Sequence, residues 1–405
     1  MDGAGHLCVL PPRFAAWFAM RGWTPRDHQL TMVEKGAAGR DVLLIAPTGG
    51  GKTLAGFLPS LIELSERSTP NTRPGVHTLY ISPLKALAVD VERNLLAPIA
   101  QMGLPVKAES RTGDTGVARR QRQRVKPPDI LLTTPEQLAL LCAWEGARLY
   151  FEDLKCVIVD EIHAVWPSKR GDLLALDLAR LHRIAPGCRR VGLSATVDDP
   201  DVIRRWLAPG EAGEVDLVRG APGAPPIVDV LLSQGQVPWA GHTARHAMPE
   251  VYDAIRGART ALVFVNTRFQ AEFAFQELWR LNDDALPIAL HHGSLAAEQR
   301  RKVEAAMARG ELRAVVCTST LDLGIDWGDV DLVIQLASPK GASRMVQRIG
   351  RANHRLDEPS RALFVPANRF EMLECQAARE AIAESALDSE VERAGALDVL
   401  AQHIM

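Results

Sequence analysis

Residues 42–53 read Val-Leu-Leu-Ile-Ala-Pro-Thr-Gly-Gly-Gly-Lys-Thr, and this stretch decides the fold class. The apolar run 42–45 is typical of a buried parallel strand. The glycines that follow let backbone N–H groups turn inward around an anion. Apolar residues at helical spacing resume at Leu54. The segment therefore predicts a strand, a phosphate-binding loop and a helix whose positive N-terminus points at the phosphates.

The side chains of this loop predict contacts to a nucleoside triphosphate. Lys52 would place its charge on the β and γ phosphates, and the Thr53 hydroxyl would bind Mg²⁺. Thr48, Gly49, Gly50 and Gly51 complete the predicted loop. Ala46 stands where the strict pattern has its first glycine, so a strand-to-helix turn without a ligand is the alternative interpretation.

A second apolar run, Cys156–Val159, leads directly into Asp160-Glu161-Ile162-His163. Ligands bind at the carboxyl ends of strands in open α/β sheets. Asp160 is therefore a candidate to hold Mg²⁺ directly or through water, and Glu161 to orient or deprotonate the attacking water. A strand-end pair that caps the next helix is the alternative.

Strand-like runs alternate with helix-like segments along most of the chain, which predicts the α/β fold class with two tandem doubly wound parallel-sheet domains and a cleft between them. The runs include 42–46, 78–82, 130–133, 157–160 and 191–194 in the first half, and 261–265, 314–318, 332–336 and 362–365 in the second. Glycine, proline and alanine become frequent between them. We therefore expect domains at 1–205 and 246–370, a β-like connection at 206–245 with a patch at 227–232, and a helical extension at 371–405 that leads towards a further domain.

Composition fits an intracellular enzyme. The chain has 405 residues, a formal net charge of −2 and six cysteines without C-x-x-C spacing, which favours reduced thiols over a zinc site. The sequence contains no run of eighteen apolar residues, so it predicts no membrane span. The basic stretch 119–126 could contact a nucleic-acid backbone, but it is more typical of a solvated helix face.

The motifs together resemble superfamily 2 helicases of the DExH type, whose box reads Asp-Glu-Ile-His here. The resemblance runs from about Phe14 to Arg355. It implies two RecA-like domains, ATP and Mg²⁺. The matching segments are 22–29, 80–87, 133–136, 194–196, 263–268, 316–326 and 347–354.

Two sequence segments, 111–115 and 160–171, resemble the Lhr (large helicase-related) group and its ligase-associated bacterial branch. This resemblance implies 3′-to-5′ movement on single-stranded DNA and the unwinding of DNA or RNA–DNA duplex in DNA repair. It also implies partners such as a ligase-associated nuclease, a monomeric chain and a bacterial cytoplasmic location.

Site residues follow from the matched motifs. For the nucleotide the resemblance implies Gln29 as the adenine-reading residue, together with Gly324, Asp326, Gln347, Arg348 and Arg351. Arg351 is the candidate arginine finger. His354 replaces the last arginine of many relatives, and a surface ion pair is the alternative role for His354 and Arg355. For the nucleic acid it implies Lys85, Arg111, Gly113, Thr134, Glu136, Asn266, Thr267, Arg268, His292, Gly293, Ser294, Thr318 and Ser319.

Two other functions stay open from the sequence. One is a nucleic-acid-stimulated ATPase that translocates without separating strands. The other is an ATP-gated clamp with slow or no turnover, against which the intact Glu161 argues.

Overall fold

The structure is a computed structural model that describes residues 10–67, 75–83, 85–195, 197–208, 214–322, 330–350, 352, 359–386, 388 and 394–404, without the side chains of 85–90 and 93–94. The chain divides into two compact units. The first holds residues up to 221 and from 389 onward, and the second holds residues 222–388 with loop residues 47–49. Among the described residues, no helix is both long and apolar enough to cross a membrane.

The first unit is built on a parallel sheet, seven-stranded within the described residues, in the order β3-β4-β2-β5-β6-β1-β7. Its strands are β1 Val42–Ile45, β2 Thr78–Ile81, β3 Ala108–Arg111, β4 Ile130–Thr133, β5 Cys156–Val159, β6 Arg189–Ser194 and β7 Asp216–Arg219. Its helices are α1 Pro12–Met20, α2 Asp27–Ala37, α3 Lys52–Ser65, α4 Lys85–Gln101, α5 Val117–Val125, α6 Pro135–Cys142, α7 Ala147–Phe151, α8 Ile162–Val165, α9 Lys169–Ile184, α10 Pro200–Leu207 and α16 Leu397–Ile404.

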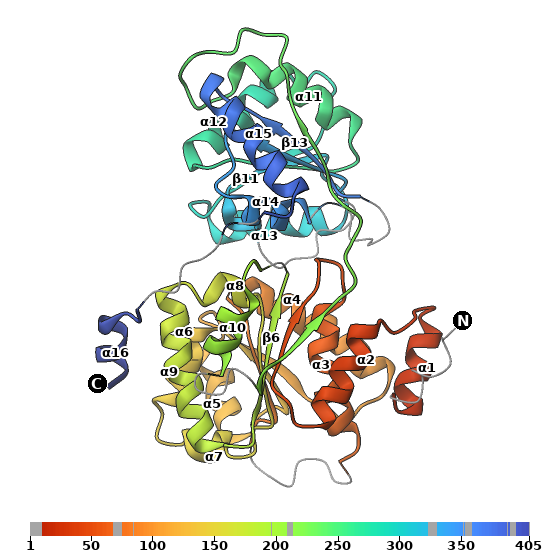
Figure 1. Ribbon diagram of the computed structural model, residues 1–405, viewed down its shortest axis with the longest axis vertical. Coiled ribbons are helices and arrows are strands. Elements are labelled where there is room, and N and C mark those ends of the chain that lie inside the picture. Colours follow the sequence, from red (N-terminus) through yellow and green to blue (C-terminus); the bar gives the residue numbers. More distant parts are fainter. Residues whose placement is uncertain are drawn as a thin grey trace. The chain divides into compact units, whose positions relative to one another are not determined.

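Both faces of this sheet are buried, which explains why its strands read as continuous apolar runs. Successive side chains of a strand point to opposite faces. Leu44 therefore packs in the core under α2 and α3, whereas Leu43 packs in the core under α6 and α9. Figure 1 shows these two pairs of helices on opposite sides of the strands.

The second unit repeats this architecture with a parallel sheet, six-stranded within the described residues, in the order β10-β11-β9-β12-β13-β8. The strands are β8 Ile227–Val230, β9 Ala261–Phe264, β10 Ile288–His291, β11 Ala314–Cys317, β12 Leu332–Leu336 and β13 Arg361–Val365. The helices are α11 Met248–Gly257, α12 Arg268–Arg280, α13 Ala297–Ala308, α14 Ala342–Ile349 and α15 Arg369–Ala383. Val263 packs in a core with α11 and α12, and Phe264 in one with α14 and α15. The prediction of two parallel-sheet α/β domains is therefore confirmed.

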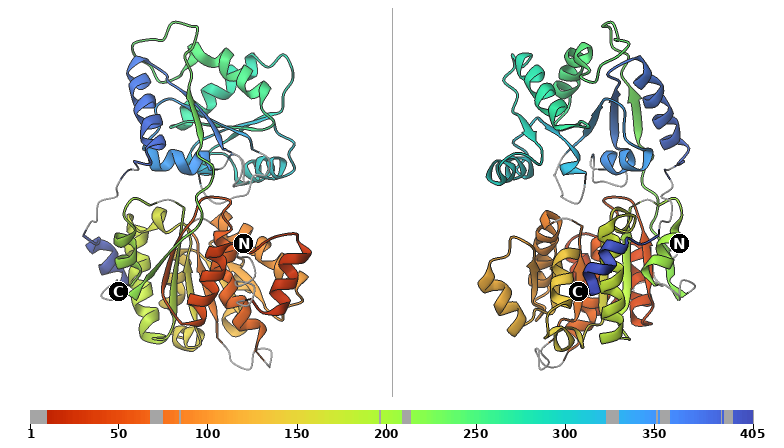
Figure 2. Two further views of the ribbon diagram at one scale, coloured as in Figure 1. Left: turned by 45° about the vertical axis from the view of Figure 1, so that its right-hand side comes forward. Right: turned by 90° about the vertical axis from the view of Figure 1, so that its left-hand side faces the viewer.

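The stretch 206–245, which the sequence suggested as a connection, contributes one edge strand to each sheet. β7 pairs with β1, and β8 pairs with β13. The C-terminal stretch 371–405 is also divided, since α15 belongs to the second unit and α16 to the first. Figure 2 shows α16 lying along α9.

Polar contacts hold α16 against α9. The Lys169 ammonium lies 2.6 Å from an Asp398 carboxylate oxygen, and the backbone N–H of Ala396 donates to Asp172 at 3.1 Å. Val399 is buried within this contact. The C-terminal helix is thus part of the first unit's outer layer.

Candidate nucleotide site and nucleic-acid interface

The glycine-rich loop between β1 and α3 has the backbone geometry of an anion cradle. Gly49 and Gly51 have φ values of 74° and 73°, a left-handed conformation that favours glycine. Lys52 is the first residue of α3, and its ammonium donates to the Ala46 carbonyl oxygen at 2.8 Å. Thr53 follows in the first turn of the same helix. The loop therefore presents backbone N–H groups, one ammonium and one hydroxyl at a helix N-terminus, which suits a phosphate group.

Two neighbouring side chains of α2 hold this loop from behind. The His28 Nε2 atom lies 2.9 Å from the Gly50 carbonyl oxygen, and because a carbonyl can only accept, His28 carries its proton on Nε2. Burial lowers the pKa of His28, so the ring stays neutral. The Gln29 amide donates to the Gly51 carbonyl at 3.5 Å, and the Gln29 amide oxygen accepts from the backbone N–H of Arg26 at 2.9 Å.

Gly51 is needed for its small size as well as for its backbone conformation. A Cβ atom built on it would lie 2.8 Å from the Gln29 amide nitrogen, closer than real Cβ contacts. The predicted adenine-reading residue therefore lies against the phosphate loop. The role of Gln29 towards adenine itself stays a prediction.

The acidic residues follow β5 at the same edge of the sheet as the loop. The Tyr80 hydroxyl donates to one Asp160 oxygen, and the Glu161 backbone N–H donates to the other at 2.9 Å. Burial and the neighbouring Glu161 charge raise the pKa of Asp160 to about 6. Burial and the Asp160 charge also raise the pKa of Tyr80. Two carboxylates buried side by side need positive charge nearby, and Lys52 supplies part of it.

His163 connects the acidic pair to β6, the strand that lies between β5 and β1. Its Nε2 atom lies 3.5 Å from a Glu161 oxygen, and its Nδ1 atom lies 2.8 Å from the Ser194 hydroxyl. Sequence reasoning gave this lone histidine little weight and did not single out Tyr80 or His28. The signal for all three was their place beside a motif residue at a strand or helix end. Ser194 begins the helicase motif 194–196, whose last residue, Thr196, lies outside the described residues.

The residues present fit a magnesium–triphosphate ligand. Thr53 and Asp160 offer hydroxyl and carboxylate oxygens, the donors that Mg²⁺ prefers. Mg²⁺ is usually held by one or two carboxylates together with substrate phosphates. The Thr53 and Asp160 oxygens are therefore enough protein ligands for a Mg²⁺ ion whose triphosphate is bound by the glycine loop.

Arg111, at the end of β3, carries a buried guanidinium. One of its Nη atoms donates to the Arg120 carbonyl at 3.1 Å, and its Nε atom is buried with no hydrogen-bond partner. Among the described residues, no carboxylate forms an ion pair with Arg111. Burial lowers the pKa of Arg111, and the charges of Arg124 and Arg120 lower it further. Such a guanidinium is suited to an anion that enters from outside, because an uncompensated buried charge is costly.

The other candidates of the first unit lie at neighbouring strand ends. The Gly113 carbonyl accepts from Arg120 at 2.9 Å. Thr134 is the N-cap position of α6, and Glu136 in its first turn forms a two-bond ion pair with Arg170. Lys85 begins α4, but its side chain lies outside the described residues.

In the second unit, three adjacent strands, β10, β11 and β9, carry the predicted contacts at their carboxyl ends. Asn266 donates to the Ser338 carbonyl at 2.8 Å, and Thr267 caps α12 through a capping box with Gln270. Arg268 pairs with Glu272 on the exposed surface at 3.0 Å.

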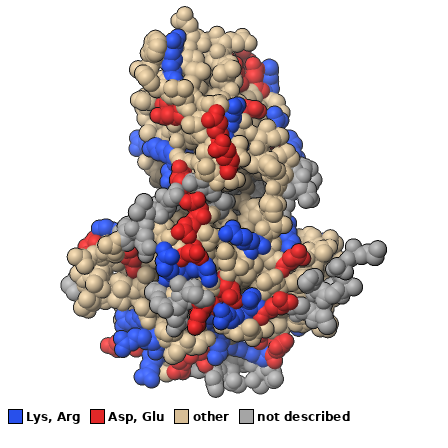
Figure 3. Space-filling model, in the orientation of Figure 1, with Lys and Arg blue, Asp and Glu red and all other residues tan. Residues whose placement is uncertain are grey.

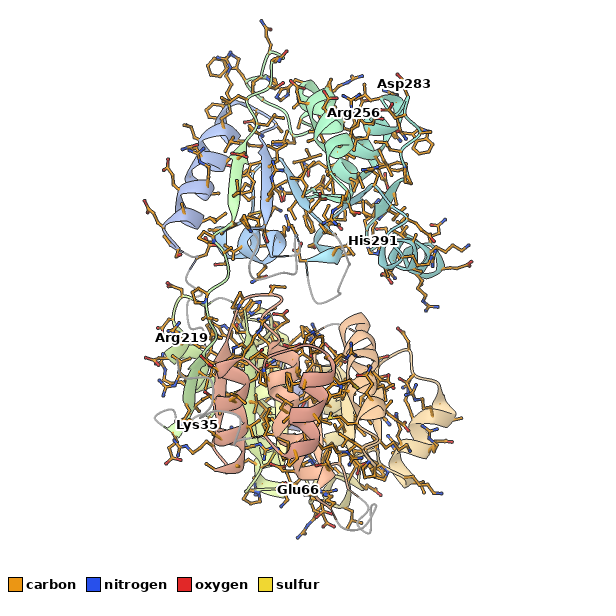
Figure 4. The ribbon with its side chains drawn as sticks, turned by 90° about the vertical axis from the view of Figure 1, so that its right-hand side faces the viewer. Lys35, Glu66, Arg219, Arg256, Asp283 and His291 are labelled. Carbon is orange, nitrogen blue, oxygen red and sulfur yellow. The ribbon has the colours of Figure 1, made fainter. Side chains whose placement is uncertain are left out.

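The remaining members of this set follow β10 and β11. His292 is buried next to Glu272, with 3.5 Å between its Nε2 atom and a carboxylate oxygen, and burial lowers its pKa. Gly293 and Ser294 come next, beyond His291, which Figure 4 labels. Thr318 precedes a short 3₁₀ turn that begins at Ser319. Parallel strands thus bring these residues to one edge of the sheet.

The motif on α14 is described only in part. Arg348 is 2% exposed. Its Nε and Nη2 atoms lie 2.7 and 3.2 Å from the Asp322 carboxylate, its Nη1 donates to Gln335, and its guanidinium lies over the Phe264 ring. These contacts give Arg348 a structural role inside the second unit. Gln347 is half-buried on the same helix. Gly324, Asp326 and Arg351, like His354 and Arg355, lie outside the described residues.

Two family models match the chain. The DEAD/DEAH box helicase model matches residues 26–204, and the helicase conserved C-terminal domain matches residues 245–355. The ATP-dependent helicase Lhr-Core of Methanothermobacter thermautotrophicus is 35% identical over 98% of this chain and 48% of that protein. The Lhr helicase/probable uracil glycosylase of Mycolicibacterium smegmatis is 35% identical over 99% of this chain and 29% of its own length.

A solved structure of Mycobacterium smegmatis helicase Lhr bound to ssDNA and AMP-PNP is similar throughout, with a TM-score of 0.86 at 35% identity. The match covers 99% of this chain and 53% of that one. The chain thus spans about half the length of these relatives or less. The phosphate loop, the Asp-Glu-Ile-His box, the two parallel sheets and these matches show that the chain belongs to the Lhr group of the superfamily 2 helicases.

Proposed function

We propose that this chain is the motor portion of an ATP-dependent helicase that moves along single-stranded DNA. Relatives named as ATP-dependent Lhr helicases support the activity, and the Lhr structure bound to ssDNA and AMP-PNP supports both ligands. The observation that carries the proposal lies in the first unit. The glycine loop after β1 and the Asp160–Glu161 pair after β5 are at one edge of a parallel sheet, linked across β6 by His163 and Ser194.

ATP hydrolysis in this proposal depends on fixed charges around the terminal phosphates. The loop N–H groups and Lys52 bind the phosphate oxygens and stabilise the charge that develops on them. Thr53 and Asp160 would hold Mg²⁺, which would neutralise more of that charge. Glu161 orients the attacking water and accepts its proton. Arg351 is proposed to act on the same phosphoryl group, with Gln347 in support.

His163 is placed to couple ATP hydrolysis to movement along the nucleic-acid strand. A change of charge at Glu161 on hydrolysis acts on the ring that hydrogen-bonds Ser194. The chain after Ser194 leads out of β6, so this contact is a route from the nucleotide to the rest of the motor.

The strand would be gripped mainly through its phosphates, which are sequence-independent contacts. Arg111 supports this, because its buried guanidinium pairs with no carboxylate in the part of the chain that the structure describes, and such a group is suited to an anion that enters from outside. On the face of the molecule that Figure 3 shows, Lys and Arg are interspersed with Asp and Glu and do not form one continuous basic band. The net charge of −2 favours binding through a few placed contacts over binding through a broad basic surface.

The finer assignments are part of the proposal and rest on the family resemblance. They are 3′-to-5′ movement, unwinding of DNA or RNA–DNA duplex, and a role in DNA repair beside a ligase-associated nuclease, in a monomer of the ligase-associated branch.

Strand displacement from tailed duplexes tests the proposal. The same labelled duplex is prepared with a 3′ tail, with a 5′ tail and with blunt ends, and is incubated with the chain, ATP and Mg²⁺. We expect displacement only from the 3′-tailed duplex. Displacement only from the 5′-tailed duplex would overturn the polarity. Phosphate release without displacement on any duplex would favour a translocase or a clamp over a helicase.

A further inference from the structure

The second unit exposes two large aromatic side chains side by side. Trp239 is 66% exposed and Phe370 is 65% exposed. Their ring centroids lie 6.5 Å apart with an interplanar angle of 57°. Aromatic residues form only 5% of this chain, so two of them held together in solvent require a reason.

The pair is held in a fixed place by contacts between α15 and the loop that carries Trp239. The Arg369 guanidinium lies 4.3 Å from the centre of the Trp239 ring, a cation–π contact. The Arg369 backbone N–H donates to the Pro238 carbonyl at 3.0 Å, and the Asn368 side chain donates to the Gly241 carbonyl at 2.8 Å. We call Trp239, Arg369 and Phe370 the aromatic platform.

The aromatic platform is joined to the predicted phosphate contacts of the second unit. The Gln270 amide donates to the His242 carbonyl at 2.7 Å, three residues beyond Trp239. Gln270 also closes the capping box with Thr267, which directly precedes Arg268. The loop after β8 and the start of α12 therefore form one hydrogen-bonded layer at the carboxyl edge of the sheet.

We propose that the aromatic platform stacks the bases of the single strand whose phosphates contact Thr267 and Arg268. The proposal rests on the nucleic-acid binding proposed above and adds a base-contacting surface to it. Proteins that bind single strands without sequence preference combine phosphate contacts with aromatic faces on which bases stack. The Arg369 guanidinium on the Trp239 ring suits this ligand, because it would lie close to the phosphates of the strand whose bases stack there. An apolar protein partner would instead have to desolvate Arg369.

Binding to a normal strand and to a strand without bases separates stacking from phosphate contact. Oligodeoxythymidylate and an abasic oligonucleotide of equal length carry the same phosphates, and fluorescence anisotropy measures their affinity for the full chain without nucleotide. We expect Trp239→Ala to weaken oligodeoxythymidylate binding roughly tenfold, since stacking is worth about 1–3 kcal/mol per base. Abasic binding should stay at the wild-type value.

Two variants control this experiment. Trp279→Ala removes a tryptophan that is 60% exposed near the other end of α12, and it should leave both affinities unchanged. Trp239→Phe keeps an aromatic face and should retain most of the oligodeoxythymidylate affinity. Equal thermal unfolding of the variants and the wild type confirms that the fold is intact.

Each result supports or overturns the proposal. Unchanged oligodeoxythymidylate binding by Trp239→Ala would overturn it and leave the aromatic platform to a protein partner. An equal loss on the abasic strand would also overturn it, because bases would then play no part. If the wild-type chain bound neither oligonucleotide, the nucleic-acid function itself would fail.

Discussion

The segments that follow β1 and β9 differ, although each strand lies within a parallel sheet buried on both faces. After β1, six residues with two left-handed glycines lead to Lys52 at the start of α3. After β9 there are only three residues, and Thr267 caps α12 through its side chain. The segment after β1 gives α3 no side-chain cap, so the N–H groups there can bind a ligand. In the segment after β9, the Thr267 side chain accepts a hydrogen bond from the Gln270 N–H at the N-terminus of α12. Loop chemistry, and not the shared fold, therefore favours the first unit as the one that binds the phosphates.

Lys52→Ala is expected to have the largest effect. The variant removes the one cation of the β1 loop, and we expect ATP turnover to fall by about 10³-fold or more, because the ammonium faces charge that develops on the phosphates. Phosphate release with saturating single-stranded DNA measures it. Arg268→Ala, the cation after β9, should reduce strand affinity and leave nucleotide affinity unchanged. Near-normal turnover in Lys52→Ala would remove the loop from the site.

Arg348→Ala tests the buried charge of the second unit. Removing Arg348 leaves the buried Asp322 carboxylate with Arg344, 3.9 Å away, as its remaining ion-pair partner among the described residues. The free energy of unfolding should therefore fall by about 3 kcal/mol, the lower end of the range for breaking a buried ion pair. Urea unfolding followed by circular dichroism measures this change. The exposed Arg268–Glu272 pair is the matched control, and its loss should cost less than about 1 kcal/mol. A stable Arg348→Ala chain without ATP turnover would instead place Arg348 at the nucleotide, as the sequence predicts.

Asp177 on α9 predicts a pH-dependent stability of the first unit. It is fully buried beside Cys142, its carboxylate lies 3.9 Å from the His403 ring, and burial raises its pKa to about 7. The folded chain therefore holds this proton between about pH 4 and 7, where the unfolded chain releases it. As a result, this group's contribution to stability is lost as the pH rises through that window.

Asp177→Asn should remove that loss. At pH 8 the variant should be more stable than the wild type by roughly 2–4 kcal/mol, and at pH 4 the two should be nearly equal. Urea unfolding at both pH values measures the difference. Asp201→Asn, which changes an exposed aspartate of α10 that pairs with Arg204 one turn along the same helix, is the control. A difference that did not vary with pH would contradict the raised pKa of Asp177.

Arg111→Gln sharpens the comparison on the side of the nucleic acid. Loss of one phosphate contact should weaken single-stranded DNA binding by about tenfold and reduce the salt slope by about 0.7. Binding isotherms at several salt concentrations give both values. Arg122→Gln is the matched control, because Arg122 is exposed on α5 and paired with Glu109. An equal effect of both variants would mean that the basic helix, and not Arg111, grips the strand.

Gly51→Ala should have an effect of the same size as Arg111→Gln, but on the nucleotide. The left-handed φ costs a non-glycine residue about 1–2 kcal/mol, and the new Cβ would contact Gln29, so ATP affinity should fall about tenfold. Calorimetric titration with a nonhydrolysable analogue measures it. Gly39→Ala has a similar φ of 66° with open space around it, and it should change stability without changing nucleotide affinity. If both variants bound nucleotide equally well, Gln29 would not position the loop.

Strands with apolar sequences could be predicted, and polar ones could not. β1, β2, β5, β9 and β11 lie where apolar runs predicted them. β3 reads Ala-Glu-Ser-Arg and carries no such signal. Its Glu109 is buried because Arg122 and Gln123 of α5 bind the carboxylate. That contact is tertiary, so no local pattern reveals it.

The same limit applies to the candidate site. The sequence indicated Lys52, Asp160 and Glu161, because glycine spacing and strand ends mark them locally. It did not indicate that Asp322 binds Arg348, or that His163 reaches Ser194. Both contacts join residues that are 26 or more positions apart, and they depend on how strands are ordered in the sheet.

The initial rate of ATP hydrolysis as a function of single-stranded DNA concentration tests the central claim most directly. We expect a low rate without DNA and a saturable increase as DNA is added, with no increase in Lys52→Ala. A wild-type rate that is independent of DNA at every concentration would contradict it, because nucleotide turnover and strand binding would then be uncoupled.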